Sequence, residues 1–529
     1  MAETRVPVLI AGAGSVGMSA AVFLAYHGVS ALVVEQEAAR SIHPRATGLG
    51  PRTMEFLRQV GLADEVDAVA VDMSAGSLGK ISGPTLAAVD LSGIPDAPPI
   101  RTGWGSGQIS PASIRGVCAQ DRLDSVLAPA AVERGAAIRY STRLVTFEQD
   151  ADGITARLDD GTTVRADYLI AADGARSGVR TALGIGTTGP GALGNPKISM
   201  LFRADLRPYT QGRHFTTCDI TGPDAPGMVV TVDGAKEWIF HTDYHPDAGQ
   251  SPADFTEQRC RALIRTAVGD PTLDVQLLSR LPWRARGLLA DTFQSERVFL
   301  IGDAAHTVPP QGAFGVNTGV ADAHNLAWKL AAVLHDQAGP ALLRTYTAER
   351  RSVADYTLGQ ALLRVANPRL HWDTSPEAGA ARTAVGMAAA PVVQLGGRYD
   401  STAVIDPDVR LPDLEDIDRV LDGTPGSRLP HLWIGERRST LDLVATGFAV
   451  LAGPAGDHWV PAAQQVADQL RIPLVATVIG VPEWPGRVGI AADGAVLVRP
   501  DQVIAWRSPT APADPAGALE RVLRQVLDR

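Results

Sequence analysis

The sequence predicts an α/β protein in which a nucleotide-binding domain carries an inserted β-sheet domain and a smaller C-terminal α/β domain. Three observations support this fold class. A dinucleotide fingerprint occupies residues 6–35, alternating strands interrupt the chain between about residues 197 and 283, and a new unit of strands and helices begins near residue 397. With 529 residues, 45% of them hydrophobic, the chain can build several cores.

The fingerprint starts with an apolar strand at residues 6–10 and passes through a glycine turn into a helix. The turn reads GAGSVG and supplies Gly12, Gly14, Ser15, Val16 and Gly17. A second strand at residues 31–34 ends at Glu35 and Gln36. In such a Rossmann-like unit the glycines admit a pyrophosphate to the helix N-terminus, and the acid accepts a hydrogen bond from a ribose hydroxyl. The acid favours FAD or NAD over NADP.

A polar loop follows, in which Arg45 is a candidate clamp for the pyrophosphate, although a solvated surface arginine explains it equally well. Helices are expected at residues 51–60 and from Gln120 onward. Residues 66–112 between them lack clear periodicity. Residues 103–107 read GWGSG but follow no strand, so they predict a loop and not a second nucleotide site.

Strands at residues 142–158 and 163–170 lead to a DGARSGVR sequence that begins with Asp173 and Gly174. The inserted domain then supplies three strands and a helix, at residues 199–206, 227–232, 237–244 and 252–268. His241 and Tyr244 lie on its last strand and could line a pocket, because ligands favour domain junctions. A half-buried sheet face explains these two residues at least as well.

Residues 298–319 are the most informative stretch. A buried strand ends at Asp303, whose carboxylate can accept hydrogen bonds from a chain of sugar-like hydroxyls. The loop and helix start that follow contain Pro309, Pro310, Gly312, Gly315, Val316, Asn317 and Gly319. The prolines hold the backbone extended, and the glycines let it approach a flat ring closely. The positive end of the following helix favours an anion there, such as a reduced flavin.

The remaining chain is expected to form a bridging helix and a separate domain. Residues 342–365 predict a helix that carries Tyr346, Glu349 and Arg350 on one side. Residues 366–394 are rich in proline and predict an irregular linker. Beyond them we expect strands at 448–452 and 473–479, a hairpin at 496–506, and helices at 461–470 and 515–527.

Composition excludes several classes of function. The net charge of −10 comes without a basic patch, which argues against nucleic acid as a partner. The three scattered cysteines predict no disulfide and no metal centre. Residues 1–5 show no signal-peptide layout, and no apolar run reaches the ~18 residues of a membrane helix, so we expect a cytoplasmic protein without a membrane partner.

Together, the GxGxxG turn with Glu35, the Asp173-Gly174 sequence with Arg180, and the 302–319 segment resemble the group A flavoprotein aromatic hydroxylases, the para-hydroxybenzoate hydroxylase family. The C-terminal extension resembles the thioredoxin-like domain of that family's phenol and polyketide hydroxylase branch. With no cysteine after Cys260, this domain is expected to be redox-inert. The resemblance implies a fold with an FAD-binding domain (1–72, 108–180 and 290–365), a substrate domain (73–107 and 181–289), a linker (366–394) and a thioredoxin-like domain (395–529).

The resemblance also implies roles for individual residues. The fingerprint glycines would hold the FAD pyrophosphate, Glu35 the adenosine ribose, and Arg45 and Gln120 the phosphate and ribityl region. Asp303 would bind the ribityl or phosphate part. The residues implied to hold the isoalloxazine are Pro309, Gly312, Gly315, Val316 and Asn317. Asp173 and Gly174 belong to a motif that the family ties to both FAD and NADPH. His241, Tyr244 and Pro310 are candidates for substrate contacts.

The activity implied by the resemblance is monooxygenation of a phenolic, polycyclic polyketide. NADPH or NADH would reduce FAD, O2 would add at C4a of the flavin, and the substrate would attack the resulting hydroperoxide. The protein would act as a monomer or homodimer, and no catalytic side chain is evident. A Baeyer–Villiger or epoxidising oxygenase on the same fold is the nearest alternative. An FAD-binding interaction module without catalysis is an alternative of another class.

Overall fold

The computed structural model describes residues 4–94, 108–373 and 375–529. The predicted GWGSG loop at residues 103–107 lies outside these described residues. A first sheet has the strand order β13-β14-β7-β1-β2-β4, with the β5–β6 hairpin joined through β7 and with β2 and β14 buried along their whole length. Its strands are β1 (Thr4–Ala11), β2 (Ala31–Val34), β4 (Ala137–Arg139), β5 (Leu144–Asp150), β6 (Gly153–Leu158), β7 (Thr163–Ala171), β13 (Gln294–Ser295) and β14 (Val298–Leu300).

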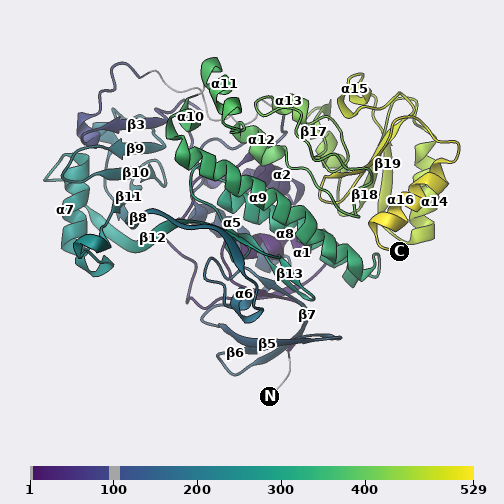
Figure 1. Ribbon diagram of the computed structural model, residues 1–529, viewed down its shortest axis with the longest axis horizontal. Helices are drawn as coiled ribbons and strands as arrows, with labels where there is room; N and C mark the ends of the chain where they lie inside the picture. Colours follow the sequence, from purple (N-terminus) through teal and green to yellow (C-terminus); the bar gives the residue numbers. More distant parts are fainter. Residues whose placement is uncertain (1–3, 95–107, 374) are drawn as a thin grey trace.

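Strands β14, β7, β1, β2 and β4 run parallel, so their carboxyl ends lie along one edge of the first sheet. Two helices that follow strands of this sheet, α1 (Ser15–Tyr26) and α8 (Gly315–Leu334), pack against each other (Figure 1). A third, α5 (Gln120–Glu133), packs on α1. The smaller helices of this region are α2 (Pro51–Gln59), α3 (Ala63–Val69) and α6 (Gly178–Ala182). This arrangement confirms the α/β fold class.

The inserted segment builds a second sheet in the order β15-β12-β8-β11-β10-β9-β3. Its strands are β3 (Lys80–Gly83), β8 (Thr187–Arg203), β9 (Thr217–Ile220), β10 (Gly227–Thr231), β11 (Glu237–Asp243), β12 (Gln276–Ala290) and β15 (His306–Thr307). Helix α7 (Glu257–Val268) covers its outer side (Figure 1). Strand β8 begins twelve residues before the predicted strand, because glycines at left-handed φ near its start imitate a loop.

The predicted irregular linker at residues 366–394 is wrong in one respect, because three short helices occupy it. They are α10 (Pro368–Trp372), α11 (Pro376–Ala384) and α12 (Ala390–Leu395). Each carries a proline in its first two positions. Proline is well tolerated there, since the missing N–H would have no helical partner. The prolines therefore mark helix starts, not a loop. Before them, α9 (Thr345–Ala366) forms the predicted bridging helix.

The C-terminal part folds around a four-stranded sheet in the order β19-β18-β20-β21. Its elements are α13 (Ile417–Val420), β16 (Trp433–Gly435), β17 (Arg438–Ser439), β18 (Phe448–Ala452), α14 (Trp459–Leu470), β19 (Leu474–Val478), α15 (Trp484–Val488), β20 (Ala495–Val498), β21 (Ile504–Ser508) and α16 (Pro515–Val526). A parallel β18-α14-β19 unit followed by the antiparallel β20–β21 hairpin and α16 is the thioredoxin-like arrangement that the sequence predicts. In the described ranges, no helix is long and apolar enough to cross a bilayer.

Candidate active site

Four of the predicted cofactor motifs leave neighbouring strands at the same edge of the first sheet. The glycine turn follows β1, Glu35 follows β2, Asp173 follows β7 and Asp303 follows β14. Backbone hydrogen bonds hold the strand ends in register, from Ala172 N–H to the carbonyl oxygen of Ala11 (2.8 Å) and from Ile301 N–H to that of Ala171 (3.0 Å). In open parallel sheets, ligands bind outside this edge. The structure therefore brings the two distant halves of the predicted site together.

The glycine turn has the close contacts that its glycines predict. Gly12 has φ +110°, and a Cβ there would lie 2.3 Å from the carbonyl oxygen of Ala172. A Cβ on Gly17 would lie 2.0 Å from the carbonyl oxygen of Gly12. At Gly14, by contrast, a Cβ would meet nothing within 4 Å. Helix α1 starts at Ser15 without a side-chain cap, so its first N–H groups remain available to a phosphate beside Gly14.

Val16 connects the glycine turn directly to the 302–319 segment. A Cβ on Gly302 would lie 3.1 Å from Val16 Cγ2, and one on Gly319 would lie 2.7 Å from the same atom. The same added Cβ on Gly319 would also lie 3.0 Å from the Cα of Gly302. Glycine at both positions therefore allows α1, α8 and the Asp303 turn to approach one another closely.

Glu35 stabilises the glycine turn. Its Oε2 accepts a hydrogen bond from Ala13 N–H (2.8 Å) and its Oε1 accepts one from Glu37 N–H (3.0 Å), whereas Gln36 is exposed. The carboxylate is half-buried, so lone pairs remain for a ribose hydroxyl.

Asp173 has one oxygen that is satisfied and one that is not. Oδ2 accepts from Val179 N–H (3.1 Å), whereas Oδ1 is buried without a hydrogen-bond partner among the described residues. Gly174 follows with φ +78°. Arg180 donates from Nη1 to the carbonyl oxygen of Ala304 (2.7 Å) and so ties this loop to the Asp303 turn. The unpaired Oδ1 points to a donor supplied by a ligand.

Asp303 is exposed, yet the surrounding protein is dense enough for burial to raise the pKa of its carboxyl. Nearby His306 and Arg45 act in the opposite direction on this pKa. Arg45 is exposed, and its backbone N–H donates to Gln120 Oε1 (3.3 Å), so these two predicted contacts lie next to each other.

The proline–glycine loop lies directly before an uncapped helix start. Pro309 is buried and Pro310 is exposed. Gly312 has φ +96°, and the half-buried Gly315 and Val316 are the first residues of α8. This helix begins with neither a side-chain cap nor an acid in its first turn. Its free N–H groups therefore suit the electron-rich edge of a flavin ring.

Asn317 fastens the start of α8 to the segment after β2. Its Oδ1 accepts from Gly50 N–H (2.8 Å) and from Thr53 Oγ1 (2.7 Å), while Nδ2 donates to the carbonyl oxygens of Ala313 (2.6 Å) and Gly48 (3.2 Å). Its side chain is thus used by the protein, which leaves its backbone for a ligand.

The face of the second sheet that packs on the first domain has an apolar part, where Leu201, Val230 and Ile239 cluster with Ala119, and a polar and aromatic part. Trp283 Nε1–H donates to Nδ1 of His241 (3.3 Å), so the His241 proton resides on Nε2. Burial, with nearby Lys197, lowers the pKa of His241 to about 3. His43, from the loop after β2, reaches this face through the hydroxyls of Ser199 (2.7 Å) and Ser279. Burial lowers its pKa to about 4.

Tyr244 does not share this face with His241. Successive residues of a strand point to opposite sides, and Tyr244 packs with its ring 6.0 Å from that of Phe255 in the core under α7. The expectation that both side chains line one pocket is therefore corrected, because Tyr244 is half-buried and packs against the core on the α7 side.

Sequence reasoning missed the polar groups that position the flavin loop from behind. Asp322 is fully buried in α8; it accepts hydrogen bonds from Gly302 N–H (3.0 Å), His306 Nε2 (2.7 Å) and Arg350 Nε (2.8 Å). Arg350 Nη1 donates to the hydroxyl of Tyr399 in the C-terminal part (3.0 Å). The sequence did contain a signal for this group, because Asp322 lies within the apolar stripe of the predicted helix. A carboxylate in such a position is buried only when it has hydrogen-bonding or charged partners.

These residues fit FAD. Open space at Gly14, an unpaired Asp173 oxygen, an accessible Asp303 and two uncapped helix N-termini belong to the segments at this edge of the first sheet. Residues 5–361 match the family described as FAD binding domain, and residues 422–529 match the aromatic-ring hydroxylase C-terminal family. The chain belongs to the FAD-dependent aromatic-ring hydroxylases.

Particular relatives are similar over the full chain. Tetracenomycin A2 monooxygenase-dioxygenase of Streptomyces glaucescens is 40% identical, covering 100% of this chain and 98% of the relative. Aklavinone 12-hydroxylase of Streptomyces purpurascens is 39% identical, with 100% of both chains covered. The structure of aklavinone-11 hydroxylase in complex with FAD and aklavinone superposes with a TM-score of 0.87 at 38% identity, again over 100% of both chains.

Proposed function

We propose that this FAD-dependent hydroxylase uses NADPH or NADH and O2 to hydroxylate a polycyclic aromatic polyketide. The observation that supports this proposal is the junction between the first domain and the second sheet. His43, from the loop after β2, bonds to Ser199 on the sheet face that also carries His241 and Trp283, so a flat substrate can lie between that face and a flavin at the strand ends. Relatives named for aklavinone and tetracenomycin chemistry favour a fused-ring substrate.

Bound FAD would supply oxygen activation, and the protein residues would bind and orient the two partners. The glycine turn, Glu35 and Asp303 hold the adenylate and ribityl parts, and the backbone at Gly315 and Val316 binds the ring. Neutral His241 donates from Nε2 to a substrate carbonyl or phenol oxygen. The substrate's own acidic phenol, not a protein base, releases the proton. Asp173 and Gly174 remain candidates for contacts with FAD and NADPH.

The test is performed on purified holoenzyme. The protein should carry FAD, and oxidation of NADPH or NADH should rise when a phenolic anthracyclinone or naphthacenequinone is added. Labelled O2 should place one oxygen atom in the product. Absence of stimulation by every such substrate would favour the non-catalytic FAD-binding module. New lactone signals in the product spectrum would identify the Baeyer–Villiger alternative. Cytoplasmic location and a monomeric or homodimeric state stay predictions, which fractionation and light scattering check.

A further inference from the structure

A cavity lies beside the start of α8, where the first domain meets the C-terminal part. It has a volume of about 70 Å³, room for a few water-sized groups. Elements α2, α8, α9 and α12 form its walls together with C-terminal segments. Its polar lining comes from Arg52, Asn317, Arg350, Gln394, Tyr399 and Arg428.

The charges around this cavity do not balance. Arg52 and Arg428 both pair with Glu55. Among the described residues, no second carboxylate is bonded to either arginine. Arg52 Nη1 lies 2.9 Å from Glu55 Oε2, and Arg428 Nε lies 3.1 Å from the same oxygen. The third arginine, Arg350, is balanced by Asp322. One buried positive charge therefore remains uncompensated beside the cavity.

The nearest other charged groups do not supply the missing charge. Arg499 and Lys329 are bonded to Glu349 and Asp501, two cations with two carboxylates. Arg52 reaches Asp501 only through its backbone carbonyl oxygen. Burial lowers the pKa of Arg52, and the adjacent Arg428 lowers it further, as expected for a surplus positive charge.

An unpaired donor lies in the same wall. Arg428 is 2% exposed, and its Nε and Nη2 bind Glu55 and the carbonyl oxygen of Ile109. Its Nη1 is buried and has no acceptor within the part of the chain that the structure describes. The Gln394 side-chain oxygen is also buried and unpaired, and rotating this amide by half a turn presents its NH2 group instead.

We propose that this cavity binds one small monovalent anion, a halide or a carboxylate of one or two carbons. The anion accepts from Arg428 Nη1 and from the rotated Gln394 amide, and it balances the Arg52–Glu55–Arg428 group. Buried donors and charges are stable only when they are paired, so a bound anion stabilises the junction between the domains. The proposal does not depend on the oxygenation reaction.

The test compares anions at constant ionic strength. Holoenzyme is melted in chloride, bromide, formate or acetate against gluconate, which is too large for the cavity. We expect the melting temperature to rise with the concentration of one or more of the small anions and to saturate as for a single site. Comparing the halides with formate and acetate shows which of the two kinds of anion binds. A bromide-soaked crystal should show an anomalous peak at Arg428 Nη1. Equal melting in all salts, or no peak there in a structure in which only water meets Arg428, would overturn the proposal.

A pair of matched variants provides a second readout. Gln394→Glu places a carboxylate of the same size in the cavity, so the response to small anions should fall at least tenfold and the melting temperature in gluconate should rise. Gln394→Met has similar size without charge and should keep a measurable response through Arg428. An unchanged response in Gln394→Glu would contradict the proposal. If either variant fails to fold, the wild-type titration and the bromide peak still decide the question.

Discussion

At the scale of single residues, the glycine turn is coupled to a buried acid. Asp124 in α5 is 5% exposed, and its Oδ1 accepts a hydrogen bond from the Ser15 hydroxyl at the start of α1. Burial raises the pKa of Asp124 to about 6 despite that hydrogen bond. In the unfolded chain its pKa returns to near 4. The folded protein therefore binds more protons than the unfolded chain between these pH values, and it loses stability as pH rises through them.

Asp124→Asn should stabilise the protein at alkaline pH, because the amide oxygen still accepts from Ser15 without a buried charge. The gain should approach zero near pH 4 and grow to as much as about 3 kcal/mol above pH 7. Urea unfolding of the variant and wild type at both pH values measures this difference. A constant difference across pH would show that titration of Asp124 does not cause the effect.

His241 offers a second prediction at this scale. Because its pKa is lowered to about 3 and that of His43 to about 4, both rings stay neutral between pH 5 and 8. His241→Ala should raise the KM for the aromatic substrate by roughly tenfold, as expected for loss of one hydrogen bond, and leave the KM for NADPH unchanged. The pH profile of wild-type kcat/KM should show no inflection from a histidine in this range. An inflection that disappears in His241→Ala would contradict the neutral assignment.

At the scale of elements, the sequence predicted most strands and helices, and its errors lie mainly where these elements begin and end. The apolar run at β1 and the GxGxxG turn carry local signals of period and glycine spacing, and both are where we expected them. Proline and glycine were ambiguous, because prolines begin helices α10 to α12, and both residue types lie within the continuous strand β8. The alternation in β11 correctly predicted a strand, but not that His241 and Tyr244 belong to opposite layers.

The contact between α1 and α8 is an element-scale device that can be tested. Gly319→Ala places a methyl group 2.7 Å from Val16 Cγ2, so it should separate the helices and weaken both stability and FAD binding. We expect a loss of about 1–3 kcal/mol in stability and at least tenfold weaker FAD binding. Fluorescence titration of the apoprotein with FAD measures the second effect.

Two further variants control this experiment. Gly359→Ala lies on an exposed side of α9 with nothing within 4 Å of the new Cβ, so it should stabilise the chain by about 0.5–1 kcal/mol. Combining Gly319→Ala with Val16→Ala should restore part of the FAD binding, because the shortest contact of the new methyl group is removed and the 3.0 Å contact with Gly302 Cα remains. Failure of this rescue would mean that the Val16 contact is not the cause.

At the scale of the whole molecule, the C-terminal part is joined to the first domain through a shared core and a buried polar network. Trp328 and Leu342 pack in one cluster with Phe448 and Trp459 of the C-terminal sheet. Such pairing of distant segments has no local sequence signal. Contacts between residues more than a hundred positions apart become visible only in the folded structure. A charged residue such as Glu349 in a buried helix face nevertheless indicates that it needs an oppositely charged partner.

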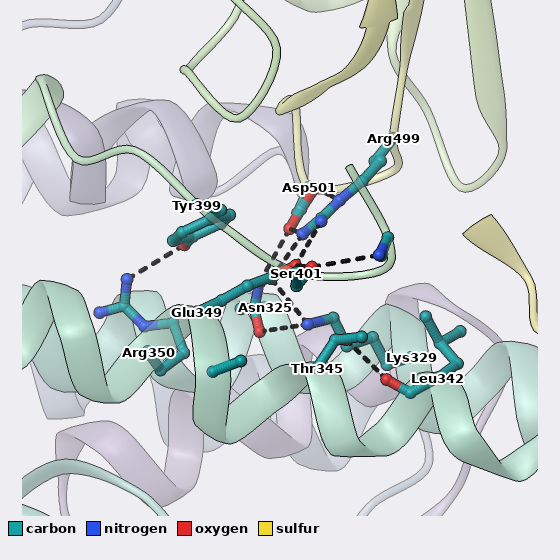
Figure 2. A network of polar contacts seen from close by, with 12 residues as sticks. Asn325, Lys329, Leu342, Thr345, Glu349, Arg350, Tyr399, Ser401, Arg499 and Asp501 are labelled. Atoms are coloured by element: carbon teal, nitrogen blue, oxygen red, sulfur yellow. Dashed lines mark hydrogen bonds and ion pairs between the residues drawn. The ribbon is translucent and has the colours of Figure 1, made fainter. Parts of the chain in front are cut away.

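Arg499 is the centre of that network. Figure 2 shows it reaching from the β20–β21 turn to Glu349, beside Asp501. Its Nη1 donates to Glu349 Oε1 (2.6 Å) and its Nη2 donates to Glu349 Oε2 (2.9 Å). Lys329 and Asn325 of α8 bind the same carboxylate at 2.7 and 2.8 Å. All of these side chains are buried, so removing one partner leaves charges that water cannot reach.

Arg499→Met should therefore destabilise the protein by about 3–5 kcal/mol, although its volume is nearly conserved. Arg410→Met is the matched control, because it removes an exposed arginine bound to Asp408 at 2.7 Å and should cost less than about 1 kcal/mol. Calorimetry should show one transition in each protein, displaced downward as a whole in Arg499→Met. Two separate transitions, only one of them shifted, would mean that the domains unfold independently and that the buried network does not couple them.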